Sequence, residues 1–217
     1  MSLKLNIKQP LHHFNLDIDV ELAASSIVGL FGDSGSGKTS LLRAIAGLNE
    51  KSSGNIDFND RQWQLNYGQL LNSSDNHNAQ TPNIGMVFQG SALFDSMTIE
   101  ENVMFPLQMF TKLSKSDMRE RADIVLKRVN LPDAHKKMPS EASGGMQKRV
   151  AIARAIVNNP KYLFCDEPNS GLDPKTAIVI DNLIQEITEE YNITTVINSH
   201  DMNSVMEIGE KIKKHGC

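Results

Sequence analysis

The stretch Gly32-Asp33-Ser34-Gly35-Ser36-Gly37-Lys38-Thr39-Ser40 decides the fold of this chain of 217 residues. Its glycines and its Lys-Thr pair have the spacing of a phosphate-binding loop. An apolar run at residues 26–31 precedes it and is typical of a buried strand, and the helical segment LLRAIAGL follows. Main-chain N–H groups of such a loop surround a β-phosphate, Lys38 contacts the β- and γ-phosphates, and the Thr39 hydroxyl binds Mg²⁺. The alternative is a glycine-rich turn with an incidental lysine.

Two carboxylates, Asp166 and Glu167, follow a second apolar run, YLFC at residues 162–165. A buried strand there would deliver both side chains to its carboxyl end. We expect Asp166 to hold Mg²⁺, mostly through water, and Glu167 to act as the general base that polarises an attacking water. The alternative is a pair of acids that cap the following turn.

Two further polar residues end predicted strands. Gln89 ends IGMVFQ, from which its side chain can reach Mg²⁺ and the attacking water. His200 ends ITTVINSH, where a neutral imidazole can hydrogen-bond the γ-phosphate and orient Glu167 and the water. Taken alone, Gln89 also fits a surface residue and His200 a structural one.

The segment EASGGMQKRVAIARA, residues 141–155, places Ser143, Gly144 and Gly145 just before a predicted helix that starts at Met146. Unpaired N–H groups and the positive dipole end make such a helix start an anion site. The predicted helix has an apolar face, and its polar face holds Lys148, Arg149 and Arg154. The alternative is a loop followed by a surface helix.

Strands that alternate with helices predict an α/β fold with a parallel sheet core. Strands at residues 3–7 and 14–20 predict an antiparallel N-terminal β-subdomain, and residues 66–83 read as a polar loop. Capping-box spacing at Thr98 and at Ser114 predicts two helices of an inserted helical subdomain. We expect a single domain, 1–217, with its core at about 1–90 and 160–217 and the helical subdomain at about 91–150.

Composition narrows the class of protein. The net charge of −4 gives no basic field for nucleic acid, so we expect no nucleic-acid partner. The 2 cysteines suggest neither a zinc site nor a disulfide framework. The sequence has no secretory h-region at its start and no apolar run near the length of a membrane span. We therefore expect a cytoplasmic chain whose membrane role comes through a partner.

The ordered set of these motifs, with SGLD at residues 170–173, resembles the ATP-binding subunit of an ABC transporter. The resemblance implies the P-loop NTPase fold, ATP and Mg²⁺ as cofactors, and a head-to-tail homodimer with ATP between the subunits. It implies that Ser143, Gly144 and Gly145 close on the γ-phosphate held by the other subunit, and that Asp173 couples the two sites. It also implies an integral membrane permease as partner and a location on the inner face of the membrane.

The sequence departs from the family pattern in three places. Ala142 and Met146 stand where the family usually has Leu and Gln around Ser-Gly-Gly. The adenine-stacking aromatic has three candidates, His12, His13 and Phe14. The chain also stops at GEKIKKHGC, where the family usually continues through two strands and a helix, so we expect an exposed sheet edge.

The two halves resemble different branches of the family. Residues 1–85 resemble molybdate-importer ATPases, and residues from Met86 onward resemble ATPases of mammalian-cell-entry-associated lipid transporters. We therefore hypothesise a composite chain joined near residues 83–89, and we expect a lipid-transport ATPase. Three alternatives stay open: a molybdate-type importer ATPase, a catalytically impaired composite cassette, and a soluble ABC ATPase that acts on DNA or ribosomes.

Overall fold

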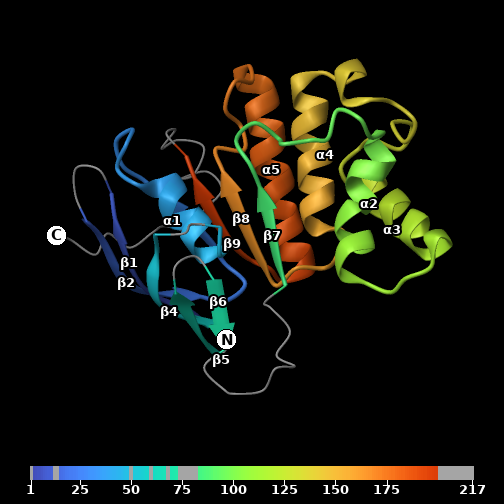
Figure 1. Cartoon of the computed structure of the whole chain (residues 1–217). Helices are drawn as coiled ribbons and strands as arrows, with labels where there is room; N and C mark the ends of the chain where they lie inside the picture. Colours follow the sequence, from blue (N-terminus) through green and yellow to red (C-terminus); the bar gives the residue numbers. More distant parts are fainter. Residues whose placement is uncertain are drawn as a thin grey trace.

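Two β-sheets and a set of helices make up the protein (Figure 1). The structure is a computed structural model that describes residues 2–11, 15–48, 51–58, 61–66, 69–72 and 83–199. The predicted site residue His200 and the candidate adenine-stacking residues His12, His13 and Phe14 therefore lie outside the described residues. The α/β class predicted from the sequence is confirmed.

The first sheet is antiparallel, with strand order β2-β1-β4-β5-β6. Its strands are β1 (Ser2–Pro10), β2 (Asn15–Ala23), β4 (Ser53–Phe58), β5 (Arg61–Asn66) and β6 (Gln69–Asn72). β1 alternates buried apolar residues (Leu3, Leu5, Ile7) with exposed ones, as a strand does when one face is covered.

Two of these strands were missed from the sequence, β5 entirely and β6 within the predicted loop of residues 66–83. In β5 the buried residues Trp63 and Leu65 alternate with an exposed one, which was a usable signal. β6 pairs with β5 through its main chain, so that Leu70 lies opposite Leu65. Main-chain pairing does not depend on side-chain polarity, which is why composition hid this strand.

The second sheet is parallel, with strand order β3-β9-β8-β7. Its strands are β3 (Ile27–Leu30), β7 (Ile84–Val87), β8 (Tyr162–Asp166) and β9 (Thr194–Asn198). Every residue of β8 and β9 is buried. Because the strands are parallel, the segments that follow them emerge at one edge of the sheet.

Six helical segments surround the sheets in the described ranges. They are α1 (Lys38–Ile45), α2 (Ile99–Phe110), α3 (Lys115–Arg128), the 3₁₀ turn η1 (Pro139–Glu141), α4 (Gly144–Ile156) and α5 (Pro174–Tyr191). The capping boxes expected at Thr98 and Ser114 are confirmed. The start predicted for α4 was two residues late, because the Ser143 hydroxyl accepts from Met146 N at 3.3 Å and so caps a first turn that includes both glycines.

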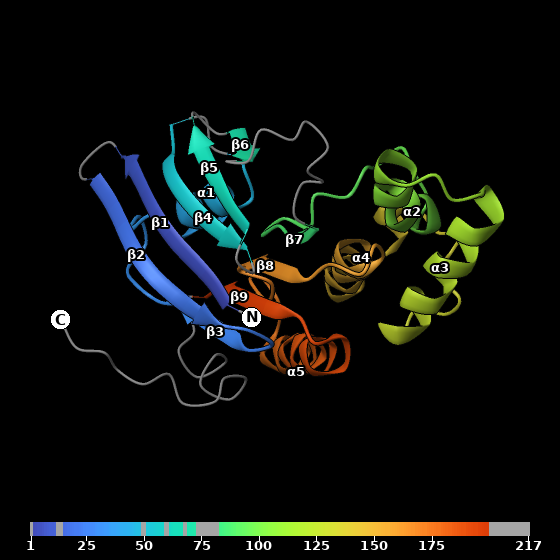
Figure 2. The same cartoon turned by 90° about the horizontal axis from the view of Figure 1, so that it is seen from below.

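The parallel sheet is covered on both faces. Phe164 and Tyr162 of β8 pack into a cluster with α1 and the antiparallel sheet, whereas Leu163 and Cys165 pack into a second cluster with α2, α3, α4 and α5. Figure 2 shows α2 and α3 at the end of the molecule away from the antiparallel sheet. The division into a core and a helical subdomain at about 91–150 stays a prediction.

Within the described ranges no helix combines the length and apolar character needed to cross a bilayer.

One close approach fixes α4 on the sheet. A Cβ at Gly85 in β7 would lie 2.4 Å from the carbonyl oxygen of Ala155 in α4. That is closer than any Cβ approaches a main-chain oxygen, so an added methyl group requires the helix to move.

We expect Gly85→Ala to lower the free energy of unfolding by about 1–3 kcal/mol, because it overpacks the contact between α4 and β7. Urea unfolding measures the change. The control is Gly90→Ala, where a Cβ meets no atom within 4 Å and where a surface change of about 0.5 kcal/mol at most is expected. Equal stability of the two variants would contradict the close packing.

Candidate functional site

The phosphate-binding loop joins β3 to α1 at the edge where the parallel strands end. Gly37, the residue before α1, has a left-handed backbone (φ 92) that favours glycine, and no side chain caps the first turn of the helix. Lys38 lies over the loop, and its ammonium donates to the carbonyl oxygens of Gly32 at 2.6 Å and Asp33 at 2.9 Å. The loop therefore presents helix N–H groups together with a positive charge.

Thr39, at the start of α1, meets the end of β8. Its hydroxyl donates to Asp166 Oδ1 at 2.8 Å. Asn198, at the end of β9, donates through Nδ2 to the same carboxylate oxygen at 2.6 Å and to Thr39 Oγ1 at 3.3 Å. Asp166 and Asn198 are both buried. The structure thus brings two of the three predicted magnesium residues, Thr39 and Asp166, into direct contact.

Asn198 was missed from the sequence. It is the polar last residue of β9 and directly follows the apolar pair Val196 and Ile197, and this position was the available signal. Its side chain is fully buried, and within the described residues its Oδ1 atom has no hydrogen-bond partner. Buried polar atoms are normally paired, so an unpaired oxygen beside Asp166 marks a place for an additional polar group.

Glu167 and Gln89 form the second contact at this edge. Gln89 Nε2 donates to Glu167 Oε2 at 2.8 Å. Glu167 has a left-handed backbone (φ 47), and its N–H donates to the carbonyl oxygen of Asn198 at 2.9 Å. Non-glycine residues in this conformation are strained and persist where the surroundings hold them. The turn directs the carboxylate of the predicted base towards the amide of Gln89.

The polar face predicted for α4 is partly buried, because Lys148 and Arg154 on that face are both buried. Lys148 donates to the carbonyl oxygens of Gln89 and, at 3.4 Å, of Glu167. Burial lowers the pKa of its ammonium, and the charges of Glu167 and Asp166 oppose that shift. Periodicity marks polar residues as exposed, but here main-chain carbonyl groups satisfy the buried cations.

The Ser-Gly-Gly segment lies against the start of α5. A Cβ at Gly145 would lie 2.7 Å from Cγ2 of Thr176. Asp173 caps α5 by accepting from the N–H groups of Lys175 and Thr176, both at 3.1 Å. Hydrogen bonds from Thr176 lower the pKa of the Asp173 carboxyl. The two segments expected to face a second subunit, residues 143–145 and Asp173, are therefore neighbours.

Comparison with known proteins identifies relatives along most of the chain. The family model described as "ABC transporter" matches residues 16–170. The methionine import ATP-binding protein of Acinetobacter baylyi is 37% identical over 201 residues, which are 92% of this chain and 54% of that protein. The sulfate/thiosulfate import ATP-binding protein of Mesostigma viride is 34% identical over 212 residues, 98% of this chain and 56% of that protein. The chain thus spans about half the length of these relatives.

The match to the Acinetobacter protein covers 92% of this chain, so it runs across the junction hypothesised at residues 83–89. These comparisons give no support to a composite chain or to the lipid-transporter resemblance.

A solved structure agrees with this fold at a TM-score of 0.77 and with 30% sequence identity, covering 97% of this chain and 92% of the other. It is a dimeric ATP-binding cassette in a post-hydrolysis state, bound to ADP and Pi. The family match over residues 16–170 shows the likeness in sequence, and the solved structure shows it in the three-dimensional arrangement. The chain therefore belongs to the ABC transporter family, and its fold is that of the family's ATP-binding cassette.

Proposed function

We propose that this chain binds and hydrolyses ATP and energises a membrane permease at the cytoplasmic face of the membrane. The observation that carries the proposal is the contact between Gln89 Nε2 and Glu167 Oε2 at 2.8 Å, at the same sheet edge as the phosphate-binding loop. Glu167 is the base that takes a proton from the attacking water, and Gln89 holds the carboxylate in place. Lys38 and the first turn of α1 hold the phosphates.

Residues at this edge fit a magnesium ion. Mg²⁺ prefers oxygen ligands, and the Thr39 hydroxyl, the Asp166 carboxylate and the Gln89 amide supply them. The unpaired Oδ1 of Asn198 adds a buried acceptor beside Asp166 that can accept from a metal-bound water. A bound Mg²⁺ supplies positive charge that offsets the charge of the phosphates during transfer. Asn198 orients Asp166 by donating to its Oδ1 atom.

The proposed active form is a head-to-tail homodimer. Ser143, Gly144 and Gly145 of one subunit close on the γ-phosphate held by the phosphate-binding loop of the other, and Asp173 lies beside them to couple the two sites. The likeness to a dimeric cassette supports this arrangement. His200 is proposed to contact the γ-phosphate and to orient the attacking water, as the family resemblance implies.

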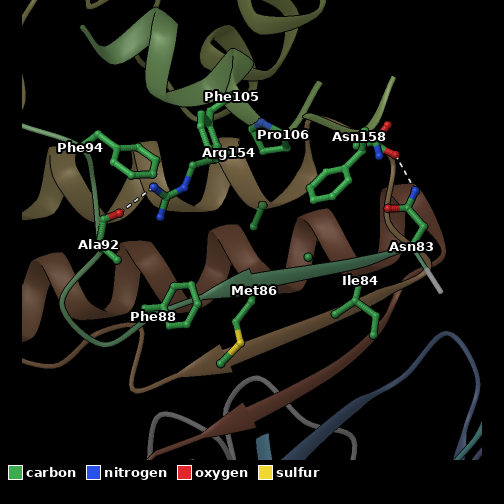
Figure 3. Close-up of a pocket in the computed structure, with 13 residues that line it drawn as sticks. Asn83, Ile84, Met86, Phe88, Ala92, Phe94, Phe105, Pro106, Arg154 and Asn158 are labelled. Carbon is green, nitrogen blue, oxygen red and sulfur yellow. Dashed lines mark hydrogen bonds between the residues drawn. The ribbon is translucent and has the colours of Figure 1, made fainter. Parts of the chain in front are cut away.

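A pocket of about 840 Å³ supports a permease as partner. It lies between β7, the segment that follows it and α2, as Figure 3 shows. Four phenylalanines are among the residues that line it, and the side chains of two of them, Phe94 and Phe105, pack with ring centroids 4.7 Å apart. Arg154 lines the same pocket. We propose that a cytoplasmic segment of the permease docks here.

The proposed cargo is a small polar solute taken up by import. The relatives named above are ATP-binding proteins for the import of methionine and of sulfate or thiosulfate. They favour the importer alternative, of which the molybdate type is one form, over the lipid cargo expected from the sequence. The alternative of an impaired cassette is decided by measuring hydrolysis.

Steady-state hydrolysis of Mg-ATP across a protein-concentration series tests the proposal. We expect activity per subunit to rise with concentration, because each site needs residues of the partner subunit.

Glu167→Gln should keep ATP binding, abolish turnover and trap a dimer. Lys38→Ala should lose binding itself, because it removes the charge that holds the phosphates. Turnover by Glu167→Gln at the parent rate would contradict the assigned base, and folded, ATP-binding parent protein without activity would favour an impaired cassette or one that needs its permease.

A second experiment tests the magnesium site. Asn198→Ala removes the donor that orients Asp166, so we expect the Mg²⁺ concentration for half-maximal stabilisation by ATP to rise about tenfold or more. Thermal unfolding with fixed ATP and varied Mg²⁺ measures it. Thr195→Val is the matched control on β9, because it breaks the buried hydrogen bond between the hydroxyls of Thr188 and Thr195. An equal Mg²⁺ requirement in the two variants would exclude the role of Asn198.

A further inference from the structure

Lys148 joins three parts of the site that are far apart in the sequence. It belongs to α4, and its ammonium donates to the carbonyl oxygen of Gln89, after β7, and to that of Glu167, after β8. Only 6% of its surface is exposed. The Gln89 side chain in turn donates to the Glu167 carboxylate at 2.8 Å. The three residues therefore form a closed ring of contacts, in which both the main chain and the side chain of Gln89 are held.

Arg154 attaches the same segment to α4 at a second point. Its guanidinium donates to the carbonyl oxygens of Ser91 and Ala92, both at 2.7 Å. Ser91 and Ala92 have left-handed backbones, with φ of 61 and 48, which non-glycine residues adopt only where the surroundings hold them. The segment at residues 89–92 is thus fixed to α4 at both ends by buried cations.

A buried cation at position 148 is unfavourable unless its contacts offset the loss of hydration. An apolar side chain of similar length would fill this space without that cost. The lysine contributes instead a donor that two main-chain carbonyl groups share, and both belong to residues proposed to act in hydrolysis. The need for a hydrogen-bond donor at the site therefore explains a lysine at this position better than the need to fill space in the core does.

We propose, on the basis of the ATPase activity proposed above, that Lys148 is a positioning residue for hydrolysis. It fixes the main chain of Gln89 relative to Glu167, so that the Gln89 amide stays on the carboxylate. Because α4 begins at the Ser-Gly-Gly segment, the same contact links that segment to the base within one subunit. Lys148 acts through Gln89 and does not touch the nucleotide.

Lys148→Met tests this role, because methionine keeps the length and removes the donor. We expect kcat to fall about 10- to 100-fold with KM for ATP nearly unchanged, since misplacement of a reacting group slows the chemical step. Lys148→Arg, which keeps a cationic donor, should recover most of kcat. Lys127→Met on α3 is the control, because it removes a lysine whose exposed ammonium pairs with Asp123. Adding Gln89→Ala to Lys148→Met should cost little more than Gln89→Ala alone, because both act on one contact.

Hydrogen exchange of the amides at residues 88–92 supplies a readout that needs no turnover. Exchange should be faster in Lys148→Met than in Lys127→Met and the parent protein. Unchanged exchange, parent-like kcat in Lys148→Met, or losses that add fully with Gln89→Ala would each overturn the inference. Absence of turnover in the folded, ATP-binding parent would instead favour an impaired cassette or one that needs its permease, and exchange would still decide whether Lys148 holds the segment.

Discussion

The common edge at which four parallel strands end is the constraint on which the rest of this molecule depends. β3 leads into the phosphate-binding loop, β7 leads towards Gln89, β8 ends in Asp166, and β9 ends in Asn198. Parallel pairing forces these ends to the same side, and burial of both sheet faces keeps them there. Residues more than a hundred positions apart thus meet within hydrogen-bond distance, as Thr39 and Asp166 do.

The helix α4 contributes to this edge from the side. Its apolar residues pack against the sheet and the neighbouring helices, while Lys148 and Arg154 cross the same interface to reach main-chain carbonyl groups. Burial lowers the pKa of both cations, so the contacts they make have to offset a loss of hydration. The result is a rigid connection between the segment after β7, the base at the end of β8 and the helix that starts with Ser-Gly-Gly.

This connection gives the proposed permease pocket a physical route to the nucleotide site. Arg154 lines the pocket and donates to Ser91 and Ala92, and two residues before Ser91 in the same segment Gln89 contacts Glu167. A partner that moves this segment would move the amide that holds the proposed base. The strained backbones of Ser91, Ala92 and Glu167 lie along this route. Because their surroundings hold them in unfavourable conformations, a small shift of those surroundings would let these backbones change conformation.

The sequence by itself determined the motifs and most of the elements that present them. Glycine spacing predicts the phosphate-binding loop, and capping boxes predict the starts of α2 and α3. Runs of apolar and β-branched residues predict β3, β7, β8 and β9. All of these signals are local along the chain. Only the tertiary structure decided the roles of Asn198, Lys148 and Arg154 and the presence of β6. A polar residue at the end of a strand or on a helix face looks solvent-exposed in any periodic pattern. Whether it is buried depends on what packs against it. Here Lys148 and Arg154 reach main-chain carbonyl groups of the segments that follow β7 and β8, and Asn198 reaches the side chains of Asp166 and Thr39.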